Sequence, residues 1–321
     1  MNTTILKKSI GFIVTSAILV ILACVLRANW EQIRDYHFQF AYDQLAISFV
    51  LFVVAFFMPA FGWGLILKNL GVHLPPKDLV RIWFYSQLTR WLPGKVWSVL
   101  SMLYLTKGIP KSTTVLSSVL ALIFNMLSGI LTVVVFIHWW PGQALAEVRG
   151  YSFIPSVLLI AGLFIYPQVL NRIYHNRFSR YCITKLGKEK WLQDVPEYNL
   201  GRKSILMILL YFFAVWVISG VAFYYFVNSV HPLSLGAMPA CILISALSWV
   251  ISFLAFVTPG GLGVKESVTT LMLTYFLPVG VALVISFALR IWMIISELFC
   301  VAIVRLFGED RSATSLPETA S

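Results

Sequence analysis

The stretches Arg90-Trp-Leu-Pro-Gly-Lys95 and Thr258-Pro-Gly-Gly-Leu-Gly-Val-Lys-Glu266 are two charged Pro-Gly breaks inside long apolar sequence. Pro93 and Pro259 are separated by about half of the 321 residues. Broken helices and ionic side chains are tolerated in a bilayer core only where protein or a water-filled cavity surrounds them. Two such breaks in corresponding halves of a chain are typical of transporters that are built from repeats.

The composition around the breaks indicates an all-α polytopic membrane protein. Hydrophobic residues make up 59% of the chain and charged residues only 12%, whereas soluble domains contain about 25% charged residues. The net charge is +11, but the basic residues lie mainly in short segments between apolar runs, as in loops that face anionic lipid. We therefore expect a bilayer as partner and no nucleic acid. The scattered cysteines and histidines show no metal-binding spacing, so we expect neither a metal nor a cofactor.

Six apolar runs approach or exceed the length of about 20 residues that a spanning helix needs. They are residues 10–26, 45–67, 115–137, 153–170, 205–227 and 282–304. Two further regions contain the Pro-Gly breaks. Region 82–106 has halves of about ten residues, too short to cross, which predicts a re-entrant helical hairpin. Region 238–277 is either a second re-entrant hairpin or a span followed by a half-helix, since 238–257 is long enough to span alone.

The loop charges predict the orientation. The loop 171–203 carries eight Lys or Arg against three Asp or Glu, whereas 228–237 and 277–281 contain no Lys or Arg. The positive-inside rule then places both termini in the cytoplasm of a multi-pass protein of the inner (cytoplasmic) membrane. Two hairpins would enter from opposite sides, as in an inverted repeat. We expect one transmembrane domain over 1–307, with 171–203 as a basic cytoplasmic loop, and a disordered polar tail over 308–321.

The second break contains residues suited to an anion. Its glycines allow a sharp turn, and a helix that begins near Val264 would point free N–H groups at the break. Lys265 in the first turn adds positive charge, while Glu266 there also suits the helix dipole and has a purely structural interpretation.

The first break offers Arg90, which can make a forked contact with phosphate, and Lys95, a cation at a helix start that needs an acidic partner or an anionic ligand. Snorkelling towards the interface is the structural alternative. In the last span, Arg290 and Glu297 share one helix face two turns apart, too far for a direct pair. We expect Arg290 to pair with Glu266, and Glu297 with Lys95 or Lys265. The predicted substrate-binding residues are Arg90, Pro93, Gly94, Lys95, Pro259, Gly260, Gly261, Gly263, Lys265, Glu266, Arg290 and Glu297.

The stretch Phe256-Val-Thr-Pro-Gly-Gly-Leu-Gly-Val-Lys-Glu-Ser267 resembles the flippase-type transmembrane domain of bacterial lysylphosphatidylglycerol synthases (multiple peptide resistance factor) and its stand-alone membrane-protein relatives. Leu92-Pro-Gly-Lys95 followed by Lys107-Gly108 is similar to an earlier Pro-Gly region of that family. The resemblance implies translocation of an anionic or aminoacylated phospholipid, or a related lipid-linked molecule, between leaflets. Aminoacyl transfer belongs to a separate soluble domain in the family, and the sequence shows no such domain, so we do not expect that activity.

Three functions remain open on the sequence. The first is a flippase for an anionic phospholipid or a polyprenyl-phosphate-linked lipid. The second is a membrane-embedded transferase for lipid-linked glycans, although Glu266 and Glu297 are the only deeply placed carboxylates. The third is an assembly factor that binds envelope-biosynthesis enzymes or forms a homo-oligomer.

Overall fold

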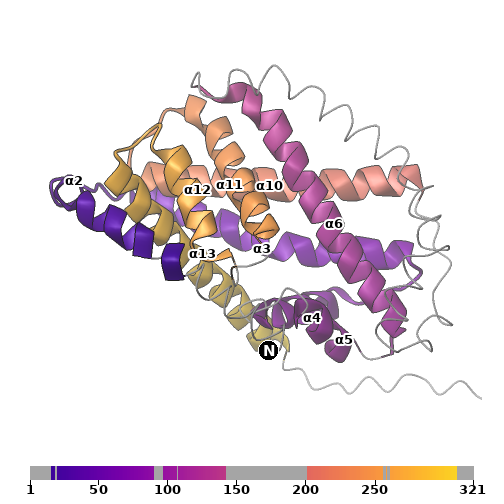
Figure 1. Ribbon diagram of the computed structural model, residues 1–321. Coiled ribbons are helices and arrows are strands. Elements are labelled where there is room, and N and C mark those ends of the chain that lie inside the picture. Colours follow the sequence, from indigo (N-terminus) through magenta and orange to yellow (C-terminus); the bar gives the residue numbers. More distant parts are fainter. Residues whose placement is uncertain are drawn as a thin grey trace, which may run out of the picture.

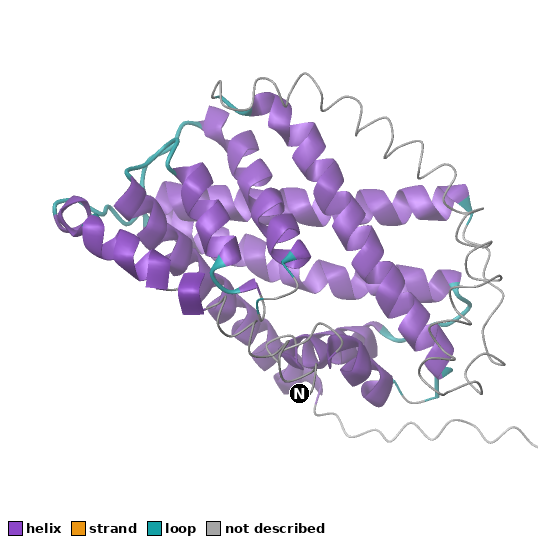
Figure 2. Cartoon of the chain, viewed as in Figure 1, coloured by secondary structure: helices purple, strands orange, loops and turns teal. Residues whose placement is uncertain are grey.

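The computed structural model describes residues 16–18, 20–89, 97–106, 108–141, 201–255, 258 and 261–308. All regular structure in these residues is helical, as Figure 2 shows. Five helical stretches among them are long and apolar enough to cross a membrane. The chain is therefore an all-α, multi-pass membrane protein, as its composition predicts.

Four long helices contain four of the predicted spans. They are α3 (Tyr42–Asn69), α6 (Lys111–Phe136), α10 (Arg202–Val230) and α13 (Val279–Gly308). The fifth candidate span is Leu235–Leu254, which consists of a short 3-10 turn and α11. The other elements are α2 (Trp30–Arg34), α4 (Pro76–Leu88), α5 (Trp97–Leu105), η2 (Ile137–Trp139), η5 (Leu235–Ala237), α11 (Met238–Leu254) and α12 (Val264–Leu273).

Several predictions concern segments that the structure describes only in part or not at all. Residues 16–18 and 20–28 are helical and include the second part of the first predicted span, 10–26. The predicted span 153–170 lies outside the described residues, as do all but the last three positions of the loop 171–203 and almost all of the tail 308–321.

One end of the bundle, here called the His231 end, gathers the start of α3 and the end of α10. The backbone N–H of Ala41 donates to the carbonyl of Ser229 at 2.9 Å, so α3 and α10 are antiparallel. The ring of Trp140, just after α6, lies 5.3 Å from that of Tyr275, between α12 and α13. One apolar core cluster fills this end, with residues from α10, α11 and α13.

The opposite end, here called the Ile205 end, has its own core cluster. It joins the end of α3, the start of α6 and the start of α10 through Leu70, Leu116 and Ile205. The end of α3 is closed by Gly71 with φ of +78°. The N–H of Val72 donates to the carbonyl of Leu67 at 3.0 Å and that of Gly71 to Lys68 at 3.1 Å, which is a Schellman motif.

The α4–α5 pair begins and ends at the Ile205 end. α4 starts at Pro76, shortly after the end of α3, and proline at the first helical position is pre-organised for a helix start. Leu79 and Met102 bring both short helices into the Ile205-end cluster. After α5, Thr106 shares a 3.1 Å hydrogen bond with Thr114 of α6.

The α11–α12 pair begins and ends at the His231 end. Its two connections, 231–237 and 274–278, join the end of α10 and the start of α13. The last turns of α11 lie beside the middle of the bundle, because Trp249 packs on Trp216 of α10 and Val250 faces Gly129 of α6. The second break therefore lies at mid-bundle. Figure 1 shows the two pairs well apart, with α4 and α5 near the bottom and α11 and α12 near the top.

Candidate functional site

The second break turns on two glycines that have no room for a side chain. Gly261 and Gly263 have φ of +68° and +84°, a region that L side chains rarely adopt. A Cβ on Gly261 would lie 1.7 Å from Oγ of Ser252 in α11. One on Gly263 would lie 2.5 Å from Cγ2 of Ile18 in the N-terminal helical segment. Two other segments, α11 and the N-terminal helical segment, therefore converge on this turn.

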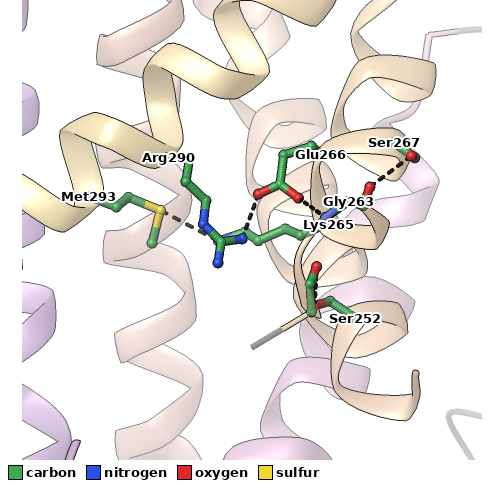
Figure 3. Close-up of polar contacts among 8 residues, drawn as sticks. Ser252, Gly263, Lys265, Glu266, Ser267, Arg290 and Met293 are labelled. Atoms are coloured by element: carbon green, nitrogen blue, oxygen red, sulfur yellow. Dashed lines mark hydrogen bonds and ion pairs between the residues drawn. The ribbon is translucent and has the colours of Figure 1, made fainter. Parts of the chain in front are cut away.

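Glu266 connects the turn to α13 through two hydrogen bonds. Its Oε2 accepts a hydrogen bond from the backbone N–H of Gly263 at 2.7 Å, which closes the first turn of α12. Its Oε1 accepts from Nη1 of Arg290 in α13 at 2.5 Å. Glu266 is 2% exposed, so this is a buried ion pair. Figure 3 shows the carboxylate between the helix start and the guanidinium.

Lys265 extends towards the same face of α13. Its Nζ lies 3.4 Å from Sδ of Met293, one turn beyond Arg290 (Figure 3). A cation in the first turn of a helix opposes the helix dipole. Lys265 and Arg290 lie on the same side of α12, which brings two cations close together, with Glu266 bound to Arg290.

A small cavity lies between α12 and α13. Its volume is about 10 Å³, room for about one water molecule. Its lining is mixed polar and apolar: Lys265, Glu266, Thr269, Ser286, Leu289, Arg290 and Met293. Deeper in the interface, the hydroxyl of Thr270 donates to that of Ser286 at 3.0 Å. This packing holds the two helices together and leaves no room for a lipid head group in the state described.

The structure brings together five of the predicted binding residues: Gly261, Gly263, Lys265, Glu266 and Arg290. The predicted pairing of Arg290 with Glu266 is confirmed. The structural interpretation of Glu266 is also supported, because the carboxylate closes the start of α12. Six predicted residues lie outside the described part of the chain: Arg90, Pro93, Gly94, Lys95, Pro259 and Gly260.

Glu297 lies two turns further along α13 and is 5% exposed. Its predicted pairing with Lys95 or Lys265 stays a prediction, and Lys95 lies outside the described part of the chain. Beyond Glu297, Cys300 packs with Phe84 of α4. One helix, α13, therefore contacts both short-helix pairs, at Arg290 and around Cys300.

Sequence reasoning missed four residues that shape the site: Ile18, Ser252, Ser286 and Met293. Met293 and Ser286 stand three residues after and four before Arg290, so helical spacing alone places them on its face. Ile18 and Ser252 meet the break only through tertiary packing, and no local pattern indicates them.

The comparisons with known proteins identify a family for the chain. The family model described as Lysylphosphatidylglycerol synthase TM region matches residues 9–302, which include both breaks and every predicted binding residue. Among curated proteins and among solved structures, no significant match is found.

Proposed function

The chain belongs to the lysylphosphatidylglycerol synthase TM region family, and we propose that it moves an anionic phospholipid or lipid-linked head group between the leaflets of a membrane. Membership of this family indicates a membrane protein related to lipid handling. The step to translocation rests on the chemistry of the second break.

The observation that carries the proposal is the pair of cations at mid-bundle. Lys265 and Arg290 lie on one side of a half-helix whose N-terminus points at the break. Ionic groups at such depth are costly and are kept where they serve a substrate or ion pathway. Two cations on one side of α12 suit an anion, and a lipid phosphate is the anion that a bilayer supplies.

The arrangement of the short helices supports a route for the head group. The α4–α5 pair starts and ends at the Ile205 end, and the α11–α12 pair at the His231 end. We propose that both are re-entrant hairpins of an inverted repeat, so that each gives access from one side. Arg90 and Lys95 of the first break would meet the head group from the other side, while the acyl chains stay in lipid.

The orientation follows from the loop charges. We propose that the Ile205 end faces the cytoplasm of the inner membrane, because Lys68, Lys111 and Arg202 all lie there. Both termini would then be cytoplasmic.

A membrane-embedded glycan transferase is less well supported. Both oxygens of Glu266 accept hydrogen bonds, one from Gly263 and one from Arg290. A carboxylate held in this way serves the helix start and the ion pair and is poorly placed as a general acid or base.

The test is a leaflet-exposure assay with the full chain in proteoliposomes that contain a fluorescent phosphatidylglycerol. We expect the wild type to move the lipid between leaflets and Lys265→Met to do so at least about tenfold more slowly, because the charge is lost. Lys265→Arg keeps the charge and should retain most of the rate.

Lys77→Met is the matched control, since Lys77 is an exposed residue in the first turn of α4. Equal rates for wild type, Lys265→Met and empty liposomes, with the proteins folded, would contradict the proposal.

A further inference from the structure

The Glu266–Arg290 ion pair joins the start of α12 to α13. The carboxylate is 2% exposed, contacts the helix N–H of Gly263 at 2.7 Å and contacts the guanidinium of Arg290. A helix start and an arginine are also the two groups that proteins use most readily for phosphate. In the structure, the carboxylate of Glu266 contacts both of these groups.

We propose that Glu266 is an internal counter-ion which an anionic head group must displace from Arg290, so that this ion pair limits the affinity of the site. This inference rests on the proposed function and adds a regulatory contact to it. The small cavity of about 10 Å³ beside the pair agrees with an occluded state.

The charges at the site explain why displacement is selective. Lys265 and Arg290 bring two cations to the site, so a head group with a net negative charge gains from both. A zwitterionic lipid brings no net charge and gains less from the two cations. Arg290 can also make a forked contact with two phosphate oxygens, whereas its contact with Glu266 runs from Nη1 to Oε1.

Displacement changes the state of Glu266. A buried carboxylate that has lost its contact with an arginine is costly to keep in that position. The N–H of Gly263 can still donate to Glu266, so α12 keeps its first turn while its ion-pair link to α13 is released and the Thr270–Ser286 hydrogen bond remains. Head-group binding would thus loosen α12 from α13, the movement that opens the occluded cavity.

The first test compares lipid binding to the purified full chain in detergent. Phosphatidylglycerol is the anionic probe, and phosphatidylcholine with the same acyl chains is the zwitterionic control. Glu266→Gln keeps the side-chain size and an oxygen for the N–H of Gly263 but removes the charge. We expect Glu266→Gln to bind phosphatidylglycerol about tenfold more tightly than the wild type, with phosphatidylcholine unchanged.

Ser267→Ala is the matched control. It removes a hydroxyl that donates to the carbonyl of Gly263 at 2.7 Å, and so perturbs the same turn without a change of charge. Its lipid affinity should equal that of the wild type. Arg290→Gln should lose the preference for phosphatidylglycerol.

The second test needs no variant. A hydrophobic carbodiimide reacts with carboxyl groups in apolar surroundings, and mass spectrometry of the modified peptide reports the release of Glu266 from its ion pair directly. We expect phosphatidylglycerol to increase the labelling of Glu266 in the wild type several-fold over phosphatidylcholine. Labelling of Glu297 serves as the internal reference.

The outcomes separate the two proposals. If the wild type prefers phosphatidylglycerol but Glu266→Gln binds it no more tightly and the lipid does not raise Glu266 labelling, the counter-ion proposal is wrong and the proposed function stands. If neither protein prefers phosphatidylglycerol, both proposals fail. Labelling decides the matter if Glu266→Gln does not fold.

Discussion

The α4–α5 pair and the α11–α12 pair occupy opposite ends of the bundle and differ in burial. In α11, the consecutive residues 240–244 are at most 4% exposed. In α5, Met102 is buried, while Tyr104 is 85% exposed. The charged residues differ in the same way, since Asp78 and Arg81 of α4 form an exposed 2.9 Å pair, whereas Glu266 and Arg290 form a buried one.

This difference indicates that the α4–α5 pair and the α11–α12 pair have different roles, although the sequence shows both as apolar regions with a Pro-Gly break. The buried pair can hold charges in a fixed geometry away from water, where electrostatic interactions are strong. The exposed pair contributes fewer buried contacts to the bundle, and segments of that kind open at lower free energy. Matched substitutions in the two regions test whether this division holds.

The largest expected difference concerns the two ion pairs. Glu266→Ala should lower the free energy of unfolding by about 3–5 kcal/mol, because it leaves Arg290 without its buried partner. Asp78→Ala, its counterpart in α4, should cost about 0–1 kcal/mol. Denaturant unfolding of both variants in one detergent measures the two values. Similar losses would mean that the pairs do not differ as described.

The second prediction concerns two glycines with positive φ. Gly263→Ala should cost about 2–4 kcal/mol, since backbone strain adds to a clash with Ile18. Gly71→Ala, before α4, should cost only about 1–2 kcal/mol of strain, because a Cβ there would have no atom within 4 Å. Unfolding midpoints give the comparison. Ile18→Ala should recover part of the loss at Gly263 and none at Gly71.

The third prediction compares two threonine hydroxyls, one in each region, whose loss should have effects of similar size. Thr270 links α12 to α13 through Ser286 at 3.0 Å, and Thr106 links the end of α5 to Thr114 of α6 at 3.1 Å. Each Thr→Val change keeps the shape. Thr270→Val removes one neutral hydrogen bond and should cost about 1 kcal/mol. Thr106→Val removes two, because its hydroxyl also donates to the carbonyl of Met102 at 2.8 Å, and should cost about 1–2 kcal/mol. A much larger loss at Thr270 would show that the α12–α13 interface depends on more than its ion pair.

The smallest expected effect concerns pH at the start of the α11–α12 pair. Burial lowers the pKa of His231 below its ordinary value of 6.5, and Nδ1 of His231 lies 2.6 Å from the hydroxyl of Tyr36. At a pH between the lowered and the ordinary pKa, His231 binds a proton in the unfolded chain but stays neutral in the folded chain. Stability should therefore be full above about pH 6.5 and fall slightly as the pH drops through the lowered pKa.

Unfolding midpoints measured between about pH 8 and pH 5 check this slope. His231→Gln should remove that part of the pH dependence, and an unchanged slope in the variant would assign it to other groups. Because the pair of His231 and Tyr36 has no counterpart among the described residues of α4 and α5, the effect also separates the two regions.

Hydropathy predicted the four long helices well, because a spanning helix must be apolar for about 20 residues. It underestimated their length at most ends. The helix hydrogen bonds continue past the apolar run, so Asp43, Lys111 and Arg202 lie within the first turns of their helices. The pairing of Arg290 with Glu266 was also predictable, since a buried charge in a bundle requires a partner.

Other features depend on tertiary packing that no local pattern encodes. The contact of Ile18 with Gly263 joins segments far apart in the chain. For region 238–277, the sequence left two alternatives open, because α11 has the length of a span. Only the contacts of Trp249 and Val250 with the middle of α10 and α6 show how far it reaches.

The brevity of α12 has a consequence for how the protein is made. At 10 residues, α12 is too short to settle in a bilayer by itself as the ribosome delivers it. Arg290, which stabilises the start of α12, is synthesised later, as part of α13. We therefore expect the second break to remain open during synthesis and to acquire its final shape when α13 inserts, so the insertion of α13 is the step that completes the charged centre.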